Sequence, residues 1–135
     1  MTNRALRLTT RDYDYLTPLA YGDVVAEGLD IKLDPRLGGF MLTGNPSYEA
    51  GEISLSQYLI RTSQGEREYV GLPAFVARGF RHRIFIVLRG SNIQSFKDLD
   101  GKRVGTAGWI DTGNVWARAA LREQGVQIDG IDWWE

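Results

Sequence analysis

A strand–helix–strand pattern at the start of the chain restricts the possible folds more than any other part of the sequence. Residues 4–10 alternate polar and apolar side chains, as a β-strand with one buried face does. Residues 15–21 predict a short helix that Asp14 caps and Gly22 ends. Residues 28–33 alternate again and predict a second strand. This order indicates an α/β fold in which the two strands pair in parallel.

Short strands and helices continue to alternate in the middle of the chain. A strand is predicted to end near Ile53, and residues 55–62 predict a helix with one apolar face. Residues 69–73 predict a further strand, and residues 82–88 carry the longest β signal in the chain. The glycine- and proline-rich residues 35–47 predict irregular structure.

A new strand and helix follow a break near residues 89–94. The pattern predicts a short helix over residues 95–101, a strand over 102–107, a helix over 113–124 and a strand beginning at 126. Five residues of the longer helix are expected to be buried: Val115, Trp116, Ala119, Ala120 and Leu121.

We therefore predict two α/β lobes, residues 1–90 and residues 91–135. The second lobe is expected to be incomplete, because it holds one strand and one helix and stops at Trp133-Trp134-Glu135. Paired tryptophans at the end of a domain need further structure to cover them. Association with a missing C-terminal part, or a homo-oligomer, would supply that cover.

Composition excludes several classes of protein. Of the 135 residues, 43% are hydrophobic, which is enough for a packed core. A net charge of −1 and a pI of about 5.9 argue against nucleic-acid binding and against a polybasic membrane surface. The chain has no cysteine and one histidine, so a zinc site of the Cys/His kind is not expected. No signal or membrane-spanning segment is evident, so we expect no membrane insertion and a cytoplasmic location.

Polar residues follow several of the predicted strands, and ligands of open α/β sheets bind beyond the carboxyl ends of the strands. Four loops are expected there. The first contains Arg11, Asp12, Tyr13 and Asp14, and the second contains Ser54, Leu55 and Ser56. The third comprises residues 78–82, and the fourth contains Asp111, Thr112, Gly113 and Asn114. The third loop holds Arg78, Arg81 and the single histidine, His82.

Taken in order, these motifs resemble the 4,5-dihydroxyphthalate decarboxylase family. The resemblance rests on Asp12-Tyr13-Asp14, on residues 27–31, 52–58 and 97–105, and on Phe80-Arg81-His82. Residues 98–105 are shared by many solute-binding proteins, whereas Asp12-Tyr13-Asp14 with Phe80-Arg81-His82 is more specific to the decarboxylases. The resemblance implies the type II periplasmic-binding-protein fold, in which two α/β lobes enclose a ligand cleft. Family members are more than twice this long, so the chain is expected to be the first lobe and the beginning of the second. Residues 35–47 depart from the family, which has a helix there.

The resemblance also implies a reaction: non-oxidative decarboxylation of an aromatic dicarboxylate such as 4,5-dihydroxyphthalate, without an organic cofactor. Arg78 or Arg81 would hold the carboxylate that is retained, because arginine binds carboxylates bidentately. His82 would deliver the proton that replaces CO2 on the ring. Asp12 or Asp14 would accept a phenolic proton.

The remaining candidates would bind the small anionic aromatic ligand. Tyr13 would stack on it or hydrogen-bond to it. Ser54 and Ser56 begin one helix, and Thr112 and Gly113 begin another whose N-terminus favours an anion. A divalent ion chelated by Asp12 and Asp14 is only weakly indicated, because two carboxylates one residue apart are a poor metal signal.

Simpler interpretations compete with each of these roles. Asp12 and Asp14 are equally well read as capping and loop residues, Ser54 and Ser56 as helix caps, and His82 as a structural histidine. If residues 84–88 form a strand, Arg81 and Arg83 point to one side and His82 to the other. Two other functions stay open: a non-catalytic solute-binding protein of an ABC transporter with a small anionic ligand, and an inactive truncated fragment.

Overall fold

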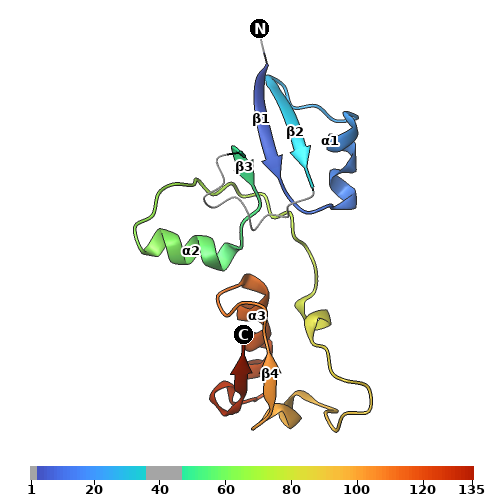
Figure 1. The fold of residues 1–135 in the computed structure, drawn as a ribbon, viewed down its shortest axis with the longest axis vertical. Coiled ribbons are helices and arrows are strands. Elements are labelled where there is room, and N and C mark those ends of the chain that lie inside the picture. Colours follow the sequence, from blue (N-terminus) through green and yellow to red (C-terminus); the bar gives the residue numbers. More distant parts are fainter. Residues whose placement is uncertain (1–2, 36–46) are drawn as a thin grey trace. The chain divides into compact units, whose positions relative to one another are not determined.

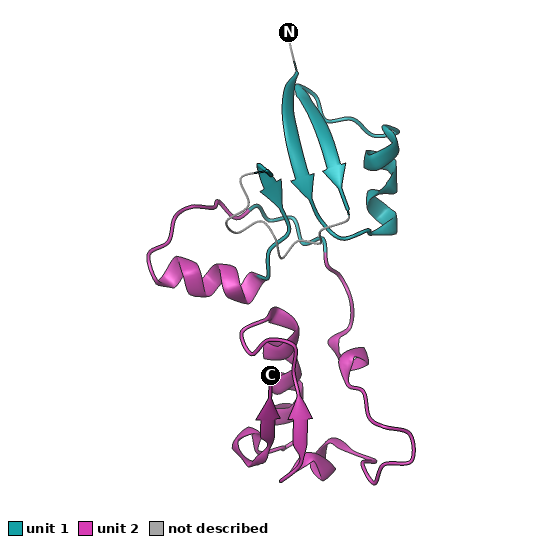
Figure 2. Cartoon of the chain, in the orientation of Figure 1, with its two compact units in different colours: residues 1–54, 72–76 teal, residues 55–71, 77–135 magenta. Residues whose placement is uncertain are grey.

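The computed structural model describes residues 3–35 and 47–135, which divide into two compact units (Figure 2). Unit 1 comprises residues 1–54 and 72–76, and unit 2 comprises residues 55–71 and 77–135. These bounds differ from the predicted lobes, residues 1–90 and 91–135, and the division into lobes stays a prediction. Most of the atypical segment 35–47 lies outside the described residues.

Unit 1 is a three-stranded parallel sheet with a helix in its first connection (Figure 1). The strands pair in the order β2-β1-β3, and Leu8 of β1 is in register with Leu33 of β2 and Ala50 of β3. The elements are β1 (Arg4–Thr9), η1 (Asp14–Leu16), α1 (Thr17–Tyr21), β2 (Leu29–Asp34) and β3 (Ala50–Gly51), where η denotes a 3₁₀ helix. The predicted strand–helix–strand opening with parallel pairing is confirmed.

Gly22 ends α1 as predicted, whereas the helix begins at Thr17 and not at Tyr15. Pro18 lies in the first turn, where its missing N–H costs no helical hydrogen bond. Gly22 ends the helix in the left-handed region with φ +80°, a conformation that a Cβ disfavours. Gly28 turns the chain into β2 with φ +76°.

Unit 2 combines a two-stranded parallel sheet with two helices and three 3₁₀ turns (Figure 1). Its elements are α2 (Leu55–Ser63), η3 (Arg81–Ile84), η4 (Phe96–Leu99), β4 (Arg103–Gly105), α3 (Thr112–Glu123), η5 (Ile128–Gly130) and β5 (Asp132–Trp134). β4 and β5 are in register at Val104 and Trp133. Both predicted helices and the short turn after Ser95 are confirmed.

The core of unit 2 lies where α3 packs near the two-stranded sheet. Five residues are buried there: Leu99, Leu121, Val126, Ile128 and Ile131. Leu121 is 1% exposed, as predicted. Val115 and Trp116 were predicted to be buried, but they are 41% and 58% exposed, and Ala119 is exposed as well.

Helical geometry explains this error. Residues three and four apart share a helix face, so Leu121 lies above Ala117 and Arg118 and not above Val115 or Trp116. η3, η5 and α2 contact α3, and the side of the helix that carries Ala117, Arg118 and Leu121 is buried or partly buried. The apolar side chains on the other side therefore remain exposed.

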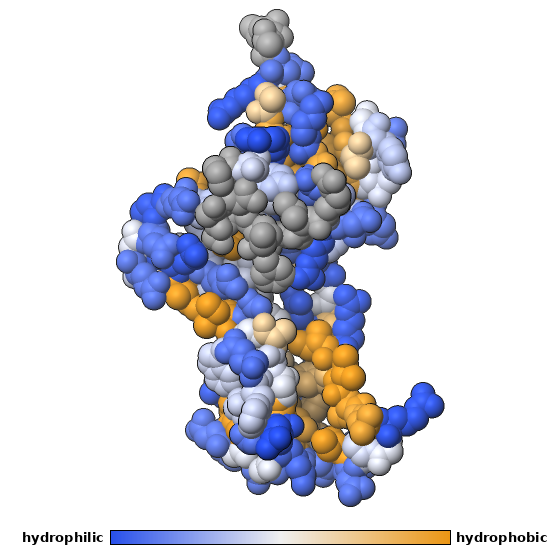
Figure 3. All heavy atoms as spheres, viewed as in Figure 1, coloured by the Kyte–Doolittle hydropathy of each residue, from blue (hydrophilic) through white to orange (hydrophobic). Residues whose placement is uncertain are grey.

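The strand predicted over residues 82–88 is not formed. η3 occupies Arg81–Ile84, and the residues after it are irregular, with Ile86 90% and Leu88 81% exposed. A strand requires a neighbour that completes its hydrogen bonds, and no described residue pairs with this segment. The strand predicted over residues 69–73 is absent for the same reason. Residues 84–88 therefore contribute exposed apolar side chains to unit 2, whose apolar surface is orange in Figure 3. Among the described residues, no helix is long and apolar enough to cross a bilayer.

Candidate functional site

The carboxyl ends of β1 and β3 meet in unit 1 at the point where the strand order reverses. The chain passes from β1 to β2 on one side and reaches β3 on the other, so the β1–β3 edge is the switch point at which such sheets bind ligands. Thr9 is in register with Gly51, and the Glu52 N–H donates to the Thr9 carbonyl at 3.1 Å. Side chains that follow these two strands are therefore held close together.

Three side chains form a hydrogen-bonded cluster at this edge. The Tyr13 hydroxyl donates to the Glu52 carboxylate, with distances of 2.9 Å to Oε1 and 3.1 Å to Oε2. The Thr10 hydroxyl donates to Glu52 Oε2 at 3.3 Å. The Tyr13 ring stacks on Tyr15 with centroids 5.3 Å apart and planes within 9°. Burial and the Glu52 carboxylate raise the pKa of Tyr13 from 10.0 to about 12, so its phenol stays protonated at neutral pH.

The two predicted acids of this loop lie on the surface. Asp12 and Asp14 are exposed, and Asp14 Oδ1 accepts the Tyr15 N–H at 2.9 Å. Asp14 is the first residue of η1 and not its N-cap, and neither η1 nor α1, both within the described residues, has a side-chain capping bond, so the predicted cap at Asp14 is wrong. Among residues 3–35 and 47–135, no three His, Cys, Asp or Glu side chains gather closely enough to hold a metal ion.

Sequence reasoning missed Glu52. The predicted strand was drawn to Ile53, which placed Glu52 inside it, whereas β3 ends at Gly51 and Glu52 is the first residue beyond it. The strand order could have identified Glu52. Because β3 pairs with β1, the residue that follows β3 lies beside the loop that follows β1 and contains Tyr13.

In unit 2, the first turns of α2 and α3 are joined. The Ser56 N–H donates to Thr112 Oγ1 at 3.0 Å, and the two hydroxyls lie 3.1 Å apart. The Ser56 hydroxyl donates to the Ile110 carbonyl at 2.5 Å, and Gln57 Nε2 donates to Asp111 Oδ1 at 2.5 Å. Two of the predicted binding residues, Ser56 and Thr112, are therefore direct neighbours. Ser54 belongs to unit 1.

Arg81 lies beside this junction. η3 packs against α3, and a Cβ added to Gly113 would lie 3.8 Å from Arg81 Nη1. A guanidinium at the first turn of a helix adds to the positive end of the helix dipole, so this corner of unit 2 favours an anion. The structure thus brings Arg81, Gly113, Thr112 and Ser56 together.

The other basic residues of the loop do not point the same way. Successive side chains of a 3₁₀ helix are about 120° apart, so Arg81, His82 and Arg83 project in three directions. The expectation that Arg81 and Arg83 share one strand face is therefore wrong. His82, Arg83 and Arg78 are exposed, whereas Arg81 is partly buried.

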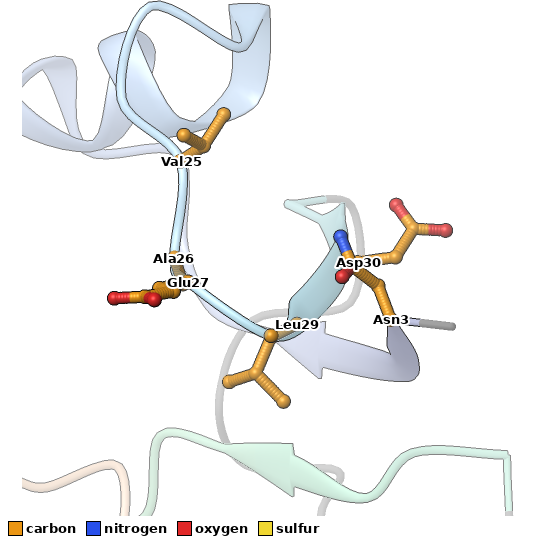
Figure 4. Close-up of a pocket in the computed structure, with 7 residues that line it drawn as sticks. Asn3, Val25, Ala26, Glu27, Leu29 and Asp30 are labelled. Atoms are coloured by element: carbon orange, nitrogen blue, oxygen red, sulfur yellow. The ribbon is translucent and has the colours of Figure 1, made fainter. Parts of the chain in front are cut away.

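A surface hollow in unit 1 lies at the end of the sheet opposite to Tyr13 and Glu52. It is lined by Asn3 and residues 25–30, at the amino ends of β1 and β2. Figure 4 shows its labelled side chains splayed outward from one another. Ligands of parallel sheets bind at the opposite end, so this hollow does not extend the candidate site.

Parallel strands joined through helices, with polar residues gathered at their carboxyl ends, define the class of the protein. Residues 70–133 match the family model described as NMT1/THI5 like. The chain has the periplasmic-binding-protein-like α/β fold, as predicted.

Two curated relatives narrow this class. A protein of Comamonas testosteroni named 4,5-dihydroxyphthalate decarboxylase is 36% identical over 98% of this chain and 42% of its own length. A protein of Pseudomonas putida with the same name is 32% identical over 98% of this chain and 53% of its own length. The resemblance to the 4,5-dihydroxyphthalate decarboxylases is thus confirmed, and the chain spans about half the length of these relatives.

Proposed function

We propose that this chain carries substrate-binding and catalytic residues of a non-oxidative decarboxylase of hydroxylated aromatic dicarboxylates such as 4,5-dihydroxyphthalate. The observation that carries the proposal is the similarity, over 98% of the chain, to two proteins named for that reaction. The gathering of polar residues at the strand ends of unit 1, and of Arg81 with two helix N-termini in unit 2, supports it.

The reaction breaks the bond between a ring carbon and one carboxylate carbon. CO2 leaves, the electron pair stays on the ring carbon, and a proton takes the place of CO2. A deprotonated hydroxyl para to that carbon feeds electrons into the ring and promotes protonation. For 4,5-dihydroxyphthalate the product is 3,4-dihydroxybenzoate, which keeps one carboxylate and both hydroxyls.

Each step is assigned to a residue of this chain. His82 is the proposed proton donor, because an imidazole exchanges protons near neutral pH. Arg81 of η3, which lies beside the first turn of α3, is proposed to hold the retained carboxylate, with Arg78 as a second cation. Asp12 or Asp14 is proposed to accept the phenolic proton, since both carboxylates are exposed.

The protein incubated with 4,5-dihydroxyphthalate is expected to release CO2 and form 3,4-dihydroxybenzoate, measured by chromatography. His82→Ala should lower turnover by about 100-fold or more, the usual share of a general acid, and leave binding of the substrate largely intact. Arg83→Ala is the matched control, because it removes the next exposed side chain of η3. Tight binding without any CO2 release by the unaltered protein would refute the enzymatic proposal.

The second candidate is a solute-binding protein for a small anionic ligand. It is favoured by the match of residues 70–133 to the NMT1/THI5-like model. Arg81 would then anchor the ligand, and no proton donor would be needed. Calorimetry would show binding of the dicarboxylate that His82→Ala does not weaken, with no product formed.

We propose that the reaction needs no organic cofactor and no metal ion. Prolonged treatment with a chelator such as EDTA should leave the rate of product formation unchanged. A loss of activity that Mg²⁺ or Mn²⁺ restores, and that Asp12→Asn with Asp14→Asn abolishes, would instead establish metal chelation by this pair.

A further inference from the structure

Glu52 joins two other side chains at the carboxyl end of the unit 1 sheet. Its backbone N–H is bonded to β1, and its carboxylate accepts hydrogen bonds from both Thr10 and Tyr13. Thr10 is 2% exposed, which fixes one of the two donors firmly. The carboxylate is thereby held in one place beside the Tyr13 hydroxyl.

This arrangement decides what the Tyr13 hydroxyl can offer a ligand. A phenol has one proton to donate and lone pairs to accept with. The proton of Tyr13 is committed to Glu52, so the oxygen is left as an acceptor. A ligand hydroxyl can donate to that oxygen. A ligand carboxylate cannot donate, and it would also lie close to the negative charge of Glu52.

We infer that Glu52 is a positioning residue that fixes Tyr13 as a hydrogen-bond acceptor, so that the carboxyl end of the unit 1 sheet selects the hydroxyl-bearing part of the ligand. The inference rests on the proposed function, which supplies an aromatic ligand that bears both hydroxyls and carboxylates. It assigns recognition of the hydroxyls to Tyr13 and Glu52, and it gives Glu52 a role in specificity.

The contacts of Tyr13 favour this assignment. Its ring is held by stacking on Tyr15, and its backbone carbonyl accepts the Leu16 N–H at 2.9 Å. The hydroxyl therefore points to Glu52 from a ring that Tyr15 covers on one face. A hydrogen bond to a charged acceptor is stronger than one to a neutral acceptor, so the phenol proton stays directed at the Glu52 carboxylate.

The test compares two ligands by calorimetry: 4,5-dihydroxyphthalate and phthalate, which has the same carboxylates and no hydroxyls. Glu52→Gln keeps the shape of the side chain, removes its charge and allows the amide to donate to Tyr13. We expect it to weaken binding of 4,5-dihydroxyphthalate by about tenfold and to leave phthalate binding unchanged or tighter. Glu49→Gln removes a nearby carboxylate that is paired with Arg7, and it should not change this ratio.

An equal loss of affinity for both ligands in Glu52→Gln would overturn the inference, because a merely structural role weakens both. Failure of the unaltered protein to bind either ligand would overturn the proposed function together with the selectivity assigned to Glu52. Binding of both ligands without turnover would refute decarboxylation alone and leave the selectivity measurable.

A second readout tests the Tyr13–Glu52 pair without any ligand. Besides burial and Glu52, Arg11 and Tyr15 act on the Tyr13 phenol, Arg11 lowering its pKa and Tyr15 raising it. Glu52→Gln removes a charge that raises the Tyr13 pKa, so the pKa should move from about 12 toward 10.0. The titration is followed by NMR of ¹³Cζ-labelled tyrosine, with the signal assigned by its loss in Tyr13→Phe. An unchanged midpoint in Glu52→Gln would refute the pairing itself.

Discussion

Arg7 and Glu49 show how one residue pair joins the strands that carry the candidate site. Arg7 Nη2 lies 2.9 Å from Glu49 Oε1, and the Arg7 N–H donates to Glu49 Oε2 at 2.8 Å. These bonds lower the pKa of Glu49 from 4.5 to about 2. Because the pKa is lower in the folded state, the pair stabilises unit 1 fully above pH 4.5 and loses its effect as pH falls toward 2.

We expect the free energy of unfolding to fall between pH 4.5 and 2 in the unaltered protein and to fall less steeply in Glu49→Gln. The effect should shrink in high salt, since both side chains are about half exposed. Urea unfolding followed by circular dichroism at several pH values measures it, with Glu27→Gln as an exposed control in unit 1. Equal slopes for Glu49→Gln and the unaltered protein would contradict the role given to this pair.

The neighbouring candidate residues of unit 2 were predictable where a local pattern marked them. Ser56 and Thr112 were identified as first-turn residues of helices, and Arg81 as a cation in a loop, and all three lie together in unit 2. Glu52 was not identified, because its importance comes from the pairing of β3 with β1, which are more than 40 residues apart. Hydrogen-bond partners at that separation are set by the strand order and not by local sequence.

At the scale of elements, α3 shows the difference between an apolar helix and a buried one. We predict that Leu121→Ala lowers the free energy of unfolding by about 2–5 kcal/mol, because it leaves a cavity in the core of unit 2. Val115→Ala on the same helix should change it by no more than about 0.5 kcal/mol, since Val115 is 41% exposed. Chemical denaturation of both variants measures the contrast. Similar losses would show that Val115 is buried, as its sequence pattern had predicted.

Helices and turns were predicted more accurately than strands, for a physical reason. The Ser95–Asp98 capping bonds and the left-handed glycines Gly22 and Gly101 act within a few residues, and the elements they limit were predicted correctly. The hydrogen bonds of a strand come from another part of the chain. Residues 82–88 have strong β propensity and no partner among the described residues, so the prediction failed there.

At the scale of the whole molecule, the fold class followed from the order of the elements, whereas the division into units did not. Parallel pairing of the first two strands follows from strand–helix–strand connectivity. α2 belongs to unit 2, where the Ser56–Thr112 and Gln57–Asp111 bonds join it to α3, a helix that is distant in sequence. No local composition shift marks this grouping.

The apolar segment after η3 leads to a prediction about the 135-residue polypeptide itself. Ile84, Ile86, Val87 and Leu88 are 36% to 90% exposed, and contiguous apolar segments with unsatisfied backbone groups pair with other chains. We expect the polypeptide to self-associate in sedimentation velocity, increasingly so with concentration. Ile86→Lys with Leu88→Lys should shift it toward monomer, because alternate residues of an extended segment point to one side and the added charges repel.

Val24→Lys with Val25→Lys is the matched control, since these residues are 57% and 81% exposed and belong to unit 1, whereas residues 84–88 belong to unit 2. The control should leave the association unchanged, with an unaltered circular dichroism spectrum in both variants. A sample that is monomeric at every concentration would show that the segment is covered within the chain. Persistent association of the Ile86→Lys, Leu88→Lys variant would place the contact elsewhere, and exposed apolar residues such as Phe80 or Trp116 would be the next to substitute.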